Sequence, residues 1–213
     1  ALEVAMKFKE NDEYDWFRGQ SGLWPLISTF NRLSVDEQKI MLKKISLLQH
    51  WANETLNLQN EDKIIAIAQH YGIPTNFIDF STDPKTAAFF ASNTSNNNSE
   101  PNEYSCIICI NTQVVSNIIE ISKNTTFKNR PHPELLSINV DNLWHLDAQK
   151  GKFLYLPMVG FELSLPFKRI IFKRSKQNGS KFVRTDYIPE RRSSLEQRFY
   201  GYIQMRILSD TTE

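Results

Sequence analysis

The segment from His70 to Ala91, HYGIPTNFIDFSTDPKTAAFFA, constrains the fold of this chain more than any other stretch. Gly72 and Pro74 interrupt whatever precedes them, and the NFIDF run that follows is typical of a short strand. Asp83 and Pro84 form the pair favoured at a helix start, a capping residue followed by proline at the first helical position. The small and aromatic residues that come next predict a buried helix. The segment therefore predicts a strand, a polar turn and a helix in direct succession.

The same segment concentrates polar side chains that could serve a binding site. A helix N-terminus offers free N–H groups and a partial positive charge, which suit a phosphate or a carboxylate. On the strand, Asp79 shares a face with Phe77, opposite Ile78 and Phe80. A structural interpretation stays open, with Asp83 as an ordinary N-cap, Asp79 as a buried acceptor and His70 as a satisfied helix-end residue. The candidate ligand-contacting residues are His70, Tyr71, Thr75, Asp79, Ser81 and Thr82.

A second candidate lies near the N-terminus, in the run FRGQ at residues 17–20. We expect Arg18 at the end of a short aromatic strand, with Gly19 letting the backbone turn. A guanidinium presents five donors in one plane and can hold two acceptors of a phosphate or a ribose. Gln20 is a weaker candidate. The structural alternative pairs Arg18 with Asp15 or Asp79.

A third polar group precedes the strand expected at KFLYL, residues 152–156. Gln149 lies at the entrance to that strand, and Gly151 allows a close backbone approach, so the amide could face a ligand. No phosphate loop of the Walker or dinucleotide type, no G-x-S-x-G turn and no histidine spacing typical of zinc ligands accompanies these residues. We therefore expect no metal site.

The remaining pattern predicts a single α/β or α+β domain over residues 1–213, a mixed sheet with flanking helices. Ser34 and Glu37 have capping-box spacing at the start of an amphipathic helix to about Trp51. The other predicted helices cover residues 62–70, 112–122 and 193–205, and the other predicted strands cover 104–110, 152–156 and 168–172. Surface loops are expected at 92–103, an Asn- and Ser-rich tract, at 129–138 and at the QNGS turn, 177–180.

Composition excludes several classes of protein. Of the 213 residues 40% are hydrophobic, enough for a core, and the formal net charge is only +1, which makes nucleic acid an unlikely partner. No run is long and apolar enough for a membrane span, so we expect a cytoplasmic protein. Cys106 and Cys109 lie three apart in an expected strand. They should point to opposite faces, which makes them a poor metal clip.

Taken together, these motifs resemble the FRG family, named for a motif that here reads Phe17, Arg18 and Gly19. The family's middle motif is similar to the segment 70–91, from His70-Tyr71-Gly72 through Asp79 and Ser81 to the helix at 88–91. Its Gln-x-Gly-x-Phe motif is similar to residues 149–153, and its late Phe-Pro segment to Tyr187-Ile188-Pro189. The resemblance thus runs over most of the chain.

The order of these motifs also resembles the Arg, Ser-Thr and Glu layout of ADP-ribosyltransferases, which implies an ADP-ribosyltransferase-like fold and NAD as substrate. By that resemblance Arg18 would contact a phosphate or ribose of NAD, Ser81 would support the nicotinamide ribose and Gln149 would hold a ribose hydroxyl. A glutamine lacks the negative charge that stabilises an oxocarbenium-like transition state, and Asp79 could supply it. The NAD-binding residues would further include Gly19, Gln20, His70, Tyr71, Thr75 and Thr82.

Two hypotheses of function follow from the resemblance. The first is an enzyme that binds NAD and transfers ADP-ribose, to a protein acceptor for example, or cleaves the nicotinamide bond, as a bacterial toxin or phage-defence effector. The second is a non-catalytic module that senses a nucleotide, a protein or a partner domain through the same pocket. Either hypothesis requires Arg18, Ser81 and Gln149 to converge on one cleft.

Overall fold

A computed structural model of the chain describes residues 1–92, 103–124, 131–138, 149–157, 160, 165–174 and 192–207. The helices are α1 (Leu2–Glu10), the 3-10 turn η1 (Phe30–Arg32), α2 (Val35–Leu56), α3 (Glu61–His70), α4 (Pro84–Ser92), α5 (Thr112–Lys123), α7 (Ser194–Tyr202) and the π-helical turn η5 (Ile203–Ile207). The strands are β1 (Trp16–Gln20), β2 (Phe77–Ser81), β3 (Tyr104–Ile110), β4 (Glu134–Leu136), β5 (Gly151–Tyr155) and β6 (Lys168–Lys173).

The six strands form one sheet in the order β4-β5-β2-β1-β3-β6. All described pairings are antiparallel, so the α+β class is confirmed, whereas the sheet is not mixed as expected. The physical reason is that strands running in the same direction are not neighbours: β2 and β3 both run opposite to β1, which lies between them. β4 is an added edge strand within the expected loop at 129–138.

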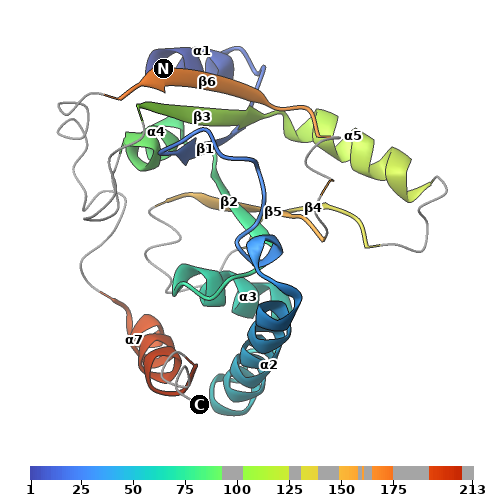
Figure 1. Cartoon of the computed structure of the whole chain (residues 1–213), viewed down its shortest axis with the longest axis vertical. Coiled ribbons are helices and arrows are strands. Elements are labelled where there is room, and N and C mark those ends of the chain that lie inside the picture. The colour runs from blue at the N-terminus through green and yellow to red at the C-terminus, as the bar shows by residue number, and fades with distance from the viewer. Residues whose placement is uncertain are drawn as a thin grey trace.

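The sheet is divided between its two central strands. β1 and β2 pair at a single position, Phe17 opposite Ser81, whereas β1 pairs with β3 over five positions and β2 with β5 over five. Figure 1 shows the two halves, with β1, β3 and β6 above and β2, β5 and β4 below. The strands β1 and β2 therefore leave backbone groups that the usual ladder does not satisfy.

Alternation along the strands distributes the core over both faces of this sheet. On one face, Phe17 packs with α4 and α1 over the upper half, and Phe77 packs with α2, α3 and α7 over the lower half. On the other face, Trp16, Ile78 and Phe80 pack with α5. The expectation that Ile78 and Phe80 share the face opposite Phe77 is confirmed.

Local sequence patterns predicted the positions of most helices correctly. The Ser34 capping box is present, although α2 continues past Trp51 to Leu56 and is followed by Asn57, the C-cap residue, in a left-handed conformation. Asp83 accepts a bond from the N–H of Lys85 at the start of α4. The N-terminal helix α1 was not predicted, and a second capping box, Ser193 with Glu196, begins α7.

Several further expectations can be compared with the structure. Cys106 and Cys109 lie in different core clusters on opposite faces of β3, as predicted. Most of the tract 92–103, the QNGS turn and residues 187–189 lie outside the described residues. Among the residues that the structure does describe, no helix combines the length and apolar composition needed to cross a bilayer.

Gly19 marks a close approach between α4 and β1. A Cβ at this position would lie 1.9 Å from the carbonyl oxygen of Ala87 and 2.6 Å from the backbone nitrogen of Ala91, both in α4. Arg18 is in the middle of β1, not at its end as expected, and Gly19 is needed for packing rather than for a sharp turn. The glycine of the first motif and the small residues of the α4 helix fit each other.

We expect Gly19→Ala to lower the free energy of unfolding by at least about 2 kcal/mol, because the new methyl group meets backbone atoms that cannot rotate away. Chemical denaturation measures the change. Gly201→Ala is the matched control, since a Cβ there meets nothing within 4 Å. In a helix that control should be neutral or slightly stabilising. Equal stability of both variants would contradict the packing role of Gly19.

Candidate functional site

Arg18 spans the split between the two halves of the sheet. Its Nη1 donates to the backbone carbonyl oxygen of Asp79 at 2.8 Å, and the same nitrogen lies 3.8 Å from the Asp79 carboxylate. This bond takes the place of a ladder bond that β1 does not make with β2. Of the two structural partners considered from sequence, Asp79 is thus the one that Arg18 contacts, while Asp15 accepts a bond from the N–H of Thr112.

The Asp79 carboxylate is held from one side and open on another. Gln69 in α3 donates from Nε2 to Oδ1 of Asp79 at 2.6 Å, and 58% of the Asp79 side chain is exposed. Asp79 is thus a hydrogen-bond acceptor, as the structural interpretation expected, but it is exposed rather than buried. An oriented and solvent-accessible carboxylate is free to accept a hydroxyl of a ligand or to face a positive charge.

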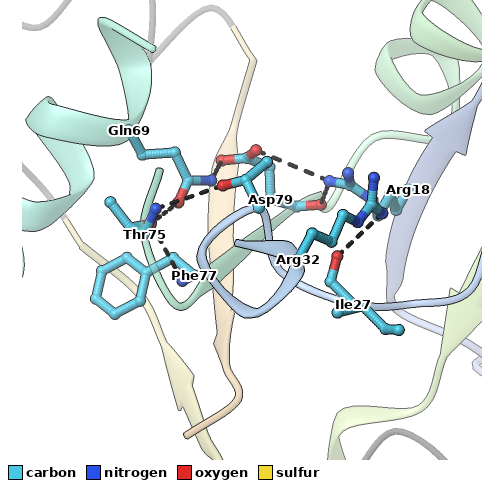
Figure 2. Close-up of polar contacts among 8 residues, drawn as sticks. Arg18, Ile27, Arg32, Gln69, Thr75, Phe77 and Asp79 are labelled. Carbon is cyan, nitrogen blue, oxygen red and sulfur yellow. Dashed lines mark hydrogen bonds and ion pairs between the residues drawn. The ribbon is translucent and has the colours of Figure 1, made fainter. Parts of the chain in front are cut away.

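A short relay fixes the orientation of Gln69. The hydroxyl of Thr75 donates to Oε1 of Gln69, which directs the amide nitrogen of Gln69 toward Asp79. Thr75 is buried, and its hydroxyl also accepts a bond from the N–H of Phe77 at 3.2 Å. Figure 2 shows the chain of contacts running from Thr75 through Gln69 and Asp79 to Arg18.

Burial disfavours the charged forms of both Asp79 and Arg18. Burial raises the pKa of the Asp79 carboxyl, and the charge of Arg18 and the bond from Gln69 oppose this shift only in part. Burial likewise lowers the pKa of the Arg18 guanidinium, against the influence of Asp79. Because 58% of the Asp79 side chain is exposed, solvent screens these effects on the pKa of its carboxyl.

A second guanidinium approaches the site. Arg32, the last residue of η1, donates from Nη2 to the carbonyl oxygen of Ile27 at 3.1 Å. Its charge lowers the pKa of Arg18, so the two cations are close enough to interact. Figure 2 shows both guanidinium groups on one side of Asp79 and Gln69 on the other.

Ser81 and Gln149 meet, but through a structural contact. The Ser81 hydroxyl donates to the backbone oxygen of Gln149 at 2.7 Å and accepts from the N–H of Asp83 at 3.0 Å. The Ser81 side chain is buried and points to the face of Asp79. The fold thus brings Arg18, Ser81 and Gln149 into neighbouring strands and their connections. That all three share one ligand cleft stays a prediction.

The other candidate residues occupy mixed positions. Gln20 is buried against the Cys106 thiol, on the face of β1 that carries Arg18. Tyr71 packs in the core and donates its hydroxyl to the backbone oxygen of Glu196, while the His70 ring lies 5.1 Å from the Tyr71 ring. The backbone oxygen of Thr82 accepts a bond from Lys9. None of these contacts points to a ligand, so their binding roles stay predictions.

Sequence reasoning missed Gln69 and Arg32. Gln69 directly precedes the His70 motif, and its position near the end of α3 gave no sign of its contact with β2. Arg32 lies in an irregular stretch without periodicity. The nearest signal was the density of polar residues after position 69, which could have suggested that the preceding helix end takes part.

The fold and the site define an α+β domain with an arginine, a carboxylate and an amide gathered at the split of an antiparallel sheet. Residues 13–100 match the sequence model of the FRG domain. Residues 13–100 thus form an FRG domain, and this matched region spans β1 to α4 and contains the whole polar network. No curated protein and no solved structure matched the chain. The likeness to ADP-ribosyltransferases stays a prediction from residues.

We expect the stability difference between wild type and Asp79→Asn to depend on pH. A carboxyl whose pKa is raised by folding stabilises the folded state fully below its unfolded pKa, about 3.9, and this contribution is lost as pH rises through the folded pKa. The amide of the Asp79→Asn variant does not titrate, so the variant should gain stability relative to wild type between about pH 3.5 and neutrality. Because Asp79 is largely exposed, the gain should be small.

Denaturant unfolding at several pH values measures this difference. Asp36→Asn is the control, since it makes the same charge change on the exposed surface of α2. A wild type that instead gains stability over Asp79→Asn toward neutral pH would show that the pair with Arg18 outweighs the burial of the carboxylate.

Proposed function

We propose that the chain binds NAD at the split between β1 and β2 and cleaves the bond between nicotinamide and ribose. The observation that carries the proposal is the contact between Arg18 and Asp79, an exposed carboxylate that Gln69 orients beside a guanidinium. Arg18 would hold a phosphate of NAD, because its planar fork matches two phosphate oxygens. Asp79 would face the nicotinamide ribose.

The chemistry assigned to Asp79 is electrostatic. When the bond from the anomeric carbon to the nicotinamide nitrogen breaks, its electron pair leaves with neutral nicotinamide and positive charge develops on the ribose. A fixed carboxylate next to that carbon lowers the energy of the charged transition state. Water then adds to the carbon and loses a proton, giving ADP-ribose, or an acceptor nucleophile takes the place of water. Asp79 thus supplies the charge that Gln149 lacks.

A second candidate, a sensor that binds a nucleotide without reaction, is favoured by the Ser81 hydroxyl. Both of its hydrogen bonds are made within the protein, to Gln149 and Asp83, so it is not available to a ribose without rearrangement. The two candidates share the binding step and differ in the chemical step. Turnover therefore decides between them.

We expect NAD to raise the melting temperature of the wild type and nicotinamide to accumulate with time. Asp79→Asn should keep the thermal shift and lose turnover by roughly 10²-fold or more, the usual cost of removing one transition-state contact. Arg18→Lys should weaken NAD binding, since an ammonium cannot make the two-pronged contact. Thermal shift and chromatographic detection of nicotinamide measure both steps.

Asp36→Asn, which removes an exposed charge that pairs with Lys39 within α2, controls for the change of charge in this assay. A thermal shift without nicotinamide release selects the sensor. Absence of any NAD-dependent shift, in a wild type that melts cooperatively, would reject NAD as the ligand.

An activity that consumes NAD would harm the cell that carries it, which gives the expected role as a toxin or phage-defence effector a direct test. Induced expression of the wild type in a bacterial host should slow growth and lower the cellular NAD content, whereas expression of Asp79→Asn at the same level should not. Equal growth at equal protein levels, with NAD unchanged, would contradict the toxin role.

A further inference from the structure

The sequence singled out one arginine at the site, whereas the structure brings two. We propose that Arg18 and Arg32 together bind a diphosphate group. This inference rests on the proposed function, which places a nucleotide at the same split, and it assigns the part of the ligand that Arg32 recognises.

Arg32 is held in place by a well-anchored backbone. The N–H of Phe30 donates to the backbone oxygen of Thr75 at 3.2 Å, which ties η1 to the segment just before β2. The Asn31 side chain donates to the backbone oxygen of Leu156 at 3.2 Å, just after β5. Two strands of the lower sheet half therefore position the turn that presents Arg32, so its approach to Arg18 is built into the fold.

The charges of Arg18, Arg32 and Asp79 leave this region with a net positive charge, which favours binding of an anion. Arg18 contacts one carboxylate, Asp79, whose Oδ1 is already engaged by Gln69, and Arg32 adds a second positive charge beside Arg18. The two cations disfavour each other, as the effect of Arg32 on the pKa of Arg18 shows. A bound anion would offset that repulsion, and the dianionic diphosphate of a nucleotide would reverse the net positive charge of the three groups.

The available donors fit an extended anion. Arg18 uses Nη1 for the Asp79 carbonyl, and its buried Nε has no hydrogen-bond partner within the described part of the chain. Arg32 uses Nη2 for the Ile27 carbonyl. A guanidinium carries five N–H donors, so each arginine retains donors for phosphate oxygens. Two planar guanidinium groups, one on β1 and one on η1, match the two linked phosphates of a diphosphate better than they match a single phosphate.

Calorimetric titration of the wild type with inorganic pyrophosphate, ADP-ribose, AMP and inorganic phosphate, at constant ionic strength, tests the proposal. We expect pyrophosphate and ADP-ribose to bind at least about tenfold more tightly than phosphate and AMP, respectively. Arg32→Gln should reduce the affinity for both diphosphates by about tenfold or more, the range for hydrogen bonds to charged groups. The chloride ions that keep the ionic strength constant should not compete measurably with the two diphosphates for this site.

Arg198→Gln is the matched control. Arg198 is likewise exposed and likewise donates one nitrogen to a backbone carbonyl, that of Thr55, but it lies on α7. Its removal should leave both affinities unchanged. If Arg32→Gln melts far below the wild type, Arg32→Lys replaces it, since it keeps the charge and loses the fork, and the wild-type comparison of diphosphate with single phosphate stands by itself.

Three results overturn the inference: no binding of pyrophosphate, phosphate binding as tightly as pyrophosphate, or diphosphate affinity unchanged in a folded Arg32 variant. These results are separable from a failure of the proposed function. Pyrophosphate binding that requires Arg32, without NAD turnover, supports the diphosphate site and rejects the enzyme. NAD turnover that is indifferent to Arg32 supports the enzyme and rejects the diphosphate site.

Discussion

The hydrogen bond from Arg18 to the backbone of Asp79 is the contact on which the organisation of this domain depends. The two halves of the sheet carry separate cores on one face and meet in a single residue pair, Phe17 with Ser81. Beyond that pair the ladder stops, and a side chain satisfies the carbonyl group of β2 that a strand would otherwise satisfy. A charged side chain placed there joins the two halves of the sheet.

Each of the three residues of the first motif, Phe17, Arg18 and Gly19, has a different structural role in β1. Phe17 fills the core over the upper half of the sheet, Arg18 reaches across the split, and Gly19 leaves space for α4. The facing positions of α4 are small residues, because the backbone of Ala87 and Ala91 lies against Gly19. The family model matches residues 13–100 and so spans both the first motif and this helix.

The site is held more firmly by neutral groups than by its charges. Burial works against both the arginine and the carboxylate, whereas Thr75 and Gln69 orient Asp79 through ordinary hydrogen bonds. Such an arrangement keeps an exposed carboxylate in one orientation at some cost to stability.

The sequence by itself determined the local elements: the strand and helix around the Asp83 turn, the Ser34 capping box, and the alternation that sets Asp79 apart from Ile78. These follow from the backbone preferences of residues a few positions apart. Only the tertiary structure decided that Arg18 meets Asp79, 61 positions away, that Gln69 orients the carboxylate and that Arg32 approaches from η1. Periodicity fixes which face a side chain takes, but the order and register of strands decide what lies opposite, and both depend on packing across the whole chain.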